Sequence, residues 1–128
     1  MSEVVLDASA LLALLNREPG HEEVARVVPD AAISAINLSE VAAKLADGGM
    51  PEEAIREALE GLALEVHDFG RELAFQTGLL RPITRSRGLS LGDRACLALG
   101  RRLDLPVLTT DRTWEGLDVG VEIKLVRS

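Results

Sequence analysis

The chain has 128 residues, of which 47% are hydrophobic, and its 14 basic and 21 acidic side chains give a net charge of −7. This length supports one core, so we predict a single domain over residues 1–128. The negative charge excludes a protein that coats nucleic acid without specificity. The apolar runs are far shorter than the roughly 20 residues that cross a bilayer. The single cysteine, Cys96, fits a cytoplasmic protein.

Short apolar runs alternate with helical patterns through the first half of the chain. Asn37 is the predicted N-cap of one helix, and Glu40 follows three residues later, as in a capping box. Pro51 is expected at the first position of the next helix, which Gly61 ends. In chain order the predicted elements are a strand over 3–6, helices over 8–16 and 21–28, a strand over 31–34, and helices over 38–46 and 51–60.

The second half continues the alternation. Its predicted elements are a strand over 62–66, a helix over 71–80, a loop over 81–90, a helix over 92–103, and strands over 107–110 and 121–126. Strands that alternate with helices are typical of a parallel sheet covered on both faces. The predicted fold class is therefore α/β, with a central, mainly parallel sheet of about five strands and helices on both faces.

Four acidic residues stand where strand-like runs give way to helix-starting residues: Asp7, Glu40, Asp93 and Asp111. In an open α/β sheet, ligands bind beyond the carboxyl ends of the strands, so we predict that the four carboxylates share one crevice. Hard oxygen ligands without a cluster of histidine and cysteine select Mg²⁺ or Mn²⁺ rather than zinc. The sequence thus predicts a divalent metal site.

Each of these acids also has a purely structural explanation. Asp7 can be an N-cap, Glu40 a capping-box acid, Asp93 a first-turn acid that complements the helix dipole, and Asp111 a turn residue. Taken singly, the four positions leave both explanations open. Their common placement at strand ends favours the metal site.

Two hydroxyl residues accompany the acids. Thr109 is expected on the same face as Asp111, and Ser9 follows Asp7 by two residues, so either hydroxyl can bind a carboxylate or a metal-bound water. Capping of the local backbone explains both hydroxyls equally well.

Five arginines gather around Asp93, and they have two explanations. They form either a solvated helix and loop face or a patch that faces phosphate groups. The five are Arg81, Arg85, Arg87, Arg94 and Arg101.

The acidic residues lie in phrases that resemble the motifs of PIN-domain ribonucleases, specifically the VapC-type toxins of bacterial and archaeal toxin–antitoxin systems. In order, the phrases are VLDASAL at 5–11, INLSEV at 36–41, LSLGDRACLAL at 89–99 and VLTTDRTW at 107–114. The resemblance covers essentially the whole chain, and each of the four acidic positions is present.

This resemblance implies a metal-dependent endoribonuclease that hydrolyses RNA phosphodiester bonds and acts as a toxin. It implies that Asp7, Glu40, Asp93 and Asp111 are the metal-binding and catalytic residues and that Mg²⁺ or Mn²⁺ is the cofactor. It also implies a homodimer and a cognate antitoxin protein. Residues 1–60, with 4 basic and 12 acidic side chains and a charge of −8, are a candidate antitoxin surface.

Three alternatives remain open on the sequence. A haloacid-dehalogenase-like phosphatase also starts with a strand ending in Asp, but it needs a second Asp two residues later, where this chain has Ser9. A receiver domain needs a phosphoacceptor Asp that closes a central strand. A PIN-like module that binds without catalysis is the third. Hydrolysis of RNA, of a small phosphate ester, or of neither separates these classes.

Overall fold

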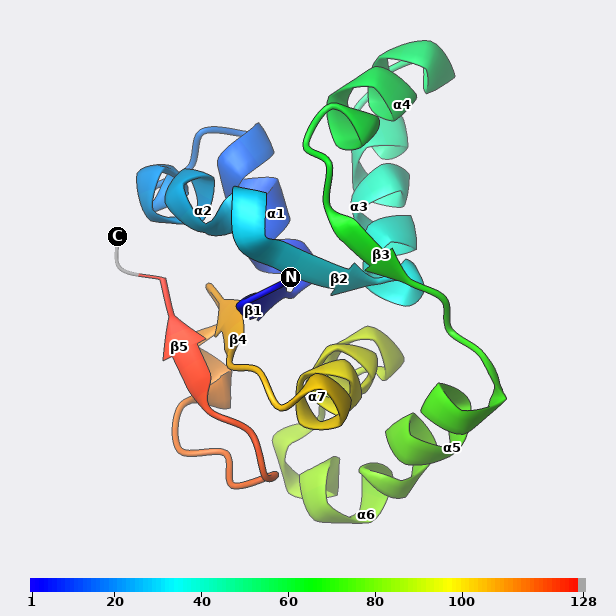
Figure 1. The fold of residues 1–128 in the computed structure, drawn as a ribbon, viewed down its shortest axis with the longest axis vertical. Coiled ribbons are helices and arrows are strands. Elements are labelled where there is room, and N and C mark those ends of the chain that lie inside the picture. Colours follow the sequence, from blue (N-terminus) through cyan, green and yellow to red (C-terminus); the bar gives the residue numbers. More distant parts are fainter. Residues whose placement is uncertain (127–128) are drawn as a thin grey trace.

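The computed structural model describes residues 1–126 and is built around a five-stranded sheet (Figure 1). The sheet order is β3-β2-β1-β4-β5, and all neighbouring strands are parallel. The chain therefore runs outward from central β1 on one side and then crosses to the other side. The strands are β1 (Val4–Leu6), β2 (Ala31–Ser34), β3 (Glu65–His67), β4 (Val107–Thr109) and β5 (Ile123–Leu125).

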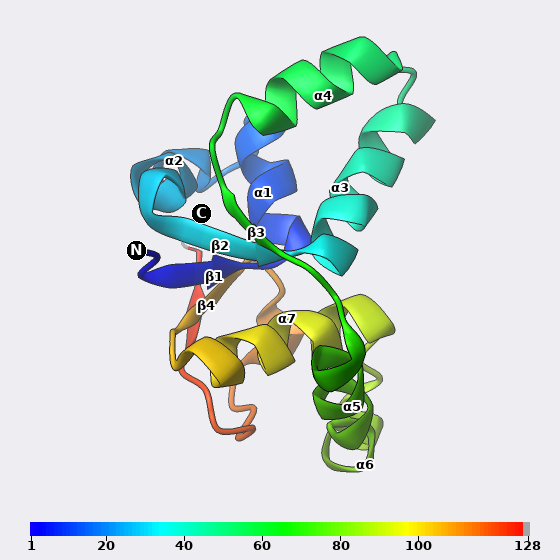
Figure 2. The same ribbon diagram turned by 45° about the vertical axis from the view of Figure 1, so that its right-hand side comes forward.

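Helices cover both faces of the sheet, as predicted, and the α/β fold class is confirmed. Figure 2 shows α1 to α4 on one side of the sheet and α5 to α7 on the other. The helices are α1 (Ala8–Leu15), α2 (His21–Val27), α3 (Ala35–Asp47), α4 (Glu52–Glu60), α5 (Arg71–Leu79), α6 (Arg81–Thr84) and α7 (Leu91–Leu103), with short 3₁₀ helices η1 (Val28–Asp30), η2 (Arg85–Arg87) and η3 (Arg112–Trp114).

Two apolar clusters fill the space between the sheet and its helices. Leu6 packs into the cluster beneath α1 and α3, whereas its neighbour Val5 packs into the cluster beneath α7. Successive side chains of a strand point to opposite faces, and both of these residues are fully buried. Burial on both faces explains why the central strands read as continuous apolar runs.

The start of α3 differs from the prediction. The helix begins at Ala35, directly after β2, and its N-cap is Ser34, whose Oγ accepts a hydrogen bond of 3.1 Å from the Asn37 amide. The predicted N-cap at Asn37 and the predicted capping box with Glu40 are therefore wrong. No loop separates strand from helix at this point, so the serine at the strand end takes the capping role.

Other boundaries also shift. Residues 81–90, predicted as a loop, contain α6 and η2, because Pro82 lies in the first turn of α6, where a missing amide hydrogen is tolerated. The third strand is displaced from 62–66 to 65–67, because Ala63 adopts a left-handed conformation with φ of 53° and turns the chain before it enters the sheet. Pro51 is the N-cap of α4 rather than its first residue.

The longest helices within residues 1–126 are α3 and α7, with 13 residues each. None in this range combines the length and the apolar character needed to cross a membrane.

Candidate active site

The side chain of Asp7 lies at the centre of the sheet, where β1 meets β4. This is the point at which the strand order reverses, and ligands of open α/β sheets bind there. Asp7 is only 4% exposed and accepts hydrogen bonds from Thr109 Oγ1 (2.6 Å), Ser9 Oγ (2.8 and 2.9 Å) and the Ala10 amide (2.9 Å). The predicted hydroxyl contacts of Thr109 and Ser9 are confirmed, and so is the N-cap role of Asp7 on α1.

The pKa of Asp7 is raised to about 6. Burial is the largest cause and the charge of nearby Asp93 adds to it, and together they outweigh the hydrogen bonds from Thr109, Ala10 and Ser9, which lower the pKa. No ion pair to Asp7 occurs within residues 1–126. A buried carboxylate is costly unless a cation compensates its charge. The chemistry of this position therefore fits a bound cation.

Glu40 is held against the start of α7 by Asn37. The Asn37 side chain is 1% exposed, and its Nδ2 donates to Glu40 Oε1 at 2.9 Å and to the Gly92 carbonyl at 3.0 Å. Its Oδ1 accepts a hydrogen bond of 2.6 Å from Ser34 Oγ. All polar groups of this buried amide are thus used, and they join the two helix layers at the site.

Gly92 makes room for the Glu40 carboxylate. A Cβ atom at this position would lie 2.3 Å from Glu40 Oε2 and 2.4 Å from Oε1, which is closer than real contacts allow. The sequence did not predict a site role for Gly92, and it assigned Asn37 to helix capping only. The three-residue spacing of Asn37 and Glu40, which places them on one helix face, is the signal that indicates Asn37.

Asp93 lies at the third position of α7 and forms a capping box with Ser90. The Ser90 amide donates to Asp93 Oδ2 at 3.0 Å, and the Asp93 amide donates to Ser90 Oγ at 3.1 Å. The pKa of buried Cys96 is raised mainly by its burial and further by the charges of Asp7, Asp93 and Glu40. These three carboxylates therefore lie in one region of the molecule, within electrostatic range of Cys96.

Asp111 joins this region through its backbone. Its amide donates to Thr109 Oγ1 at 3.0 Å, so Thr109 bridges Asp7 and Asp111. The Asp111 carboxylate caps η3, where Oδ1 accepts hydrogen bonds from Thr113 N (2.9 Å) and Thr113 Oγ1 (2.7 Å). The predicted turn role is confirmed.

The four predicted acids thus share one edge of the sheet, but their carboxylates do not converge on one point. In the described part of the chain, no three His, Cys, Asp or Glu side chains come together closely enough to hold one metal ion. The donor set nevertheless fits Mg²⁺ or Mn²⁺, because it offers only hard oxygen atoms and includes the buried, uncompensated Asp7. The assignment of all four as metal ligands stays a prediction.

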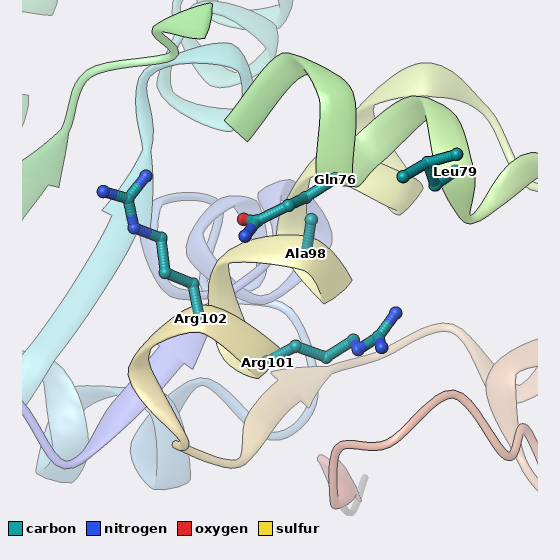
Figure 3. Close-up of a pocket in the computed structure, with 5 residues that line it drawn as sticks. All are labelled: Gln76, Leu79, Ala98, Arg101 and Arg102. Atoms are coloured by element: carbon teal, nitrogen blue, oxygen red, sulfur yellow. The ribbon is translucent and has the colours of Figure 1, made fainter. Parts of the chain in front are cut away.

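A separate cavity of about 300 Å³ lies between α5 and α7 and is lined by Gln76, Leu79, Ala98, Arg101 and Arg102. Figure 3 shows that the guanidinium groups of Arg101 and Arg102 point away from each other. The cavity therefore offers no convergent pair of cations, and the chemistry of the molecule concentrates at the carboxylate edge.

A family model described as PIN domain matches residues 4–119, a span that contains all four acids and their hydroxyl partners. The chain belongs to the PIN domain family. The match to this family rules out the haloacid-dehalogenase-like phosphatase and the receiver domain as alternative folds. The PIN fold also places the four acidic phrases at the carboxyl ends of the strands and the helix starts beside them, as the contacts above describe.

Solved structures share this PIN fold over nearly their full length. DNA-bound VapBC from Salmonella typhimurium has 24% sequence identity and a TM-score of 0.74, and the alignment covers 97% of this chain and 98% of the matched chain. VapC20 of Mycobacterium tuberculosis, a Sarcin-Ricin loop cleaving toxin, has 18% sequence identity and a TM-score of 0.73, and the alignment covers 94% of this chain and 99% of the VapC20 chain. VapBC-1 from nontypeable Haemophilus influenzae has 18% sequence identity and a TM-score of 0.72, and the alignment covers 95% of this chain and 96% of the matched chain. A sequence search of curated proteins gives no match.

Proposed function

We propose that this PIN domain is a metal-dependent endoribonuclease that hydrolyses RNA phosphodiester bonds and acts in the cytoplasm as the toxin of a toxin–antitoxin pair. The observation that carries the proposal is the buried carboxylate of Asp7 at the switch point of the sheet, which has no cationic partner within residues 1–126 and has Asp93 nearby. The structural likeness to VapC20, whose name describes a toxin that cleaves the Sarcin-Ricin loop, supports RNA as the substrate.

In this proposal Asp7, Glu40, Asp93 and Asp111 hold Mg²⁺ or Mn²⁺. When bound there, such an ion would supply Lewis-acid chemistry that activates water and neutralises charge on the scissile phosphate. Neighbouring residues orient the ligands: Thr109 and Ser9 hold both oxygens of Asp7, and Asn37 holds Glu40. The side chains at the site thus bind and orient, and no protein nucleophile is required.

The decisive experiment is cleavage of a pool of structured RNAs by the purified protein with Mg²⁺ or Mn²⁺, compared with EDTA. An Asp7→Asn, Asp93→Asn double variant, prepared identically, is the control. We expect metal-dependent cleavage that the variant lacks. Equal cleavage by both proteins would identify a contaminating nuclease, and RNA binding without cleavage would favour the non-catalytic binding module.

The antitoxin surface is proposed on the acidic first half, in the groove between α3 and α4. This groove has a volume of about 670 Å³ and an apolar lining that includes Leu38, Ala42, Ile55 and Leu59. An apolar helix fits such a groove. Charged substitutions at two of the lining positions, Ala42→Glu and Ile55→Glu, are expected to weaken antitoxin binding in a pull-down assay, and undiminished binding would remove this assignment.

A homodimer is proposed through a stripe of exposed apolar side chains on α5 and α6. Phe75, Leu79 and Ile83 are 62%, 74% and 58% exposed. Phe75 and Leu79 are four residues apart and share one face of α5, and Ile83 follows on α6. Large apolar side chains that gather on a surface mark interaction sites. A second copy of this chain is the partner that we propose for the stripe.

A further inference from the structure

Arg87 connects the segment that leads into α7, where Asp93 lies, with the η3 turn that Asp111 caps. Its Nη1 donates to the Thr113 carbonyl at 2.7 Å and to the Glu115 carbonyl at 3.1 Å. These carbonyls belong to η3 and the residue that follows it, whereas Arg87 ends η2 on the approach to α7. One exposed side chain therefore fixes the relative position of two segments that are far apart in the sequence.

Both segments end in candidate metal ligands. On one side, the Thr113 amide and hydroxyl hold Asp111 Oδ1. On the other side, Ser90 follows Arg87 by three residues and forms the capping box with Asp93. The contact between Arg87 and the η3 backbone is thus one hydrogen-bonded step away from the Asp111 carboxylate and one short loop away from Asp93.

The contact differs from those of the neighbouring arginines. Within the chain as described, neither Arg87 nor Arg85 forms an ion pair with an acidic residue, and the side chain of Arg85 makes no recorded hydrogen bond. Arg87 alone of this pair binds two backbone carbonyls. A guanidinium suits that task because its fork presents several donors in a fixed plane.

We propose that Arg87 is a positioning residue that holds the Asp111 turn against the start of α7, so that Asp111 completes the cation-binding set with Asp7, Glu40 and Asp93. This inference rests on the proposed function. It assigns the arginine a role through the backbone of η3 and not through contact with RNA. Residues that orient metal ligands typically change affinity or activity by about 10- to 100-fold when replaced.

The test compares Arg87→Gln with Arg85→Gln, a matched removal of one exposed charge two residues away, and with Arg87→Lys, which keeps the charge. The first readout needs no metal. Trp114 is the only tryptophan of the chain, is fully buried, and its amide donates to the Asp111 carbonyl at 3.1 Å. Acrylamide quenching of its fluorescence therefore reports the η3 turn, and we expect stronger quenching in Arg87→Gln alone.

The second readout is Mn²⁺ binding, followed by the electron paramagnetic resonance of the free ion, together with RNA cleavage. In Arg87→Gln we expect Mn²⁺ affinity and kcat to fall about tenfold while KM changes less than about twofold. Arg87→Lys should recover part of this loss, and Arg85→Gln should behave as wild type. The contact lies at the surface, so Tm should change by less than about 5 °C.

Several results would overturn the inference. Unchanged Mn²⁺ affinity with a raised KM and a weaker salt dependence would show that Arg87 contacts RNA directly. Unchanged quenching of Trp114 would show that the turn does not depend on Arg87, and a fall in Tm beyond about 10 °C would show a general role in folding. Wild-type protein that neither binds Mn²⁺ nor cleaves RNA would contradict the proposed function itself, and with it the active-site role of Arg87.

Discussion

The carboxylate of Asp7 experiences two opposing effects. Burial favours its protonated form, whereas the donors Thr109, Ala10 and Ser9 favour its charged form. Burial is the larger effect, and the pKa is raised from 3.8 to about 6. Between about pH 4 and pH 6 the folded chain holds a proton that the unfolded chain has released. The contribution of Asp7 to the free energy of unfolding therefore falls as the pH rises through this window, by up to about 3 kcal/mol.

Replacement of Asp7 by asparagine should remove this loss of stability at higher pH. In EDTA at pH 7.5 we expect Asp7→Asn to be more stable than wild type, because the neutral amide carries no desolvated charge. At pH 4 the difference should shrink, since the wild-type carboxyl is then protonated in the fold. Urea unfolding at both pH values measures the difference in the free energy of unfolding between the two proteins. A variant that is less stable than wild type at pH 7.5 would show that the buried charge is already compensated.

Replacement of Gly92 by alanine should displace Glu40. The new methyl group would occupy the space of the Glu40 carboxylate, so the carboxylate must leave Asn37 or the start of α7 must move. We expect Mn²⁺ affinity to fall by about tenfold or more, measured by calorimetry. Gly78→Ala is the control, because a Cβ atom there meets nothing within 4 Å. Equal affinity of the two variants would contradict the role of Gly92.

At the scale of the elements, the hydrophobic pattern predicted the strands and helices better than the capping residues predicted where the helices begin. The alternation of apolar runs and helices identified all five strands of the described sheet. The signal is strongest for β1, β2 and β4, which are buried along their whole length, and weaker for the edge strands β3 and β5, which contain charged residues. The α3 start was misplaced, because a Ser34 N-cap at a strand end has no turn signal beside it. The hydrogen bond from Asn37 to the Gly92 carbonyl was not predicted for a related reason: it joins α3 to α7, and no local pattern encodes a contact between segments that far apart.

The stripe on α5 and α6 gives a prediction at the same scale. Leu79→Glu and Ile83→Glu should convert a dimer to a monomer, because each would bury an unpaired charge in the interface. Ala74→Glu is the control, as it adds the same charge on an exposed position of α5 off the stripe. Sedimentation velocity measures the change, and a wild-type protein that is already monomeric would contradict the assignment.

At the scale of the whole molecule, a net charge of −7 and an uncompensated acidic edge should make stability depend on divalent cations. A ligand that binds only the folded state raises its stability, by about 2.7 kcal/mol when present at 100 times its Kd. We expect Mn²⁺ to raise Tm in calorimetric scans of the wild type, and to raise it far less in the Asp7→Asn, Asp93→Asn variant. An equal rise in both would indicate binding elsewhere on the acidic surface.

The strand order has a consequence for synthesis on the ribosome. β1 ends directly before Asp7 and pairs on one side with β4, whose last residue, Thr109, donates to the Asp7 carboxylate. A nascent or truncated chain that stops before residue 107 thus leaves the central strand with one edge unpaired and lacks Thr109 and Asp111. Activity of the proposed nuclease should therefore arise only after β4 and Asp111 have been translated, and fragments that terminate before residue 107 should be inactive.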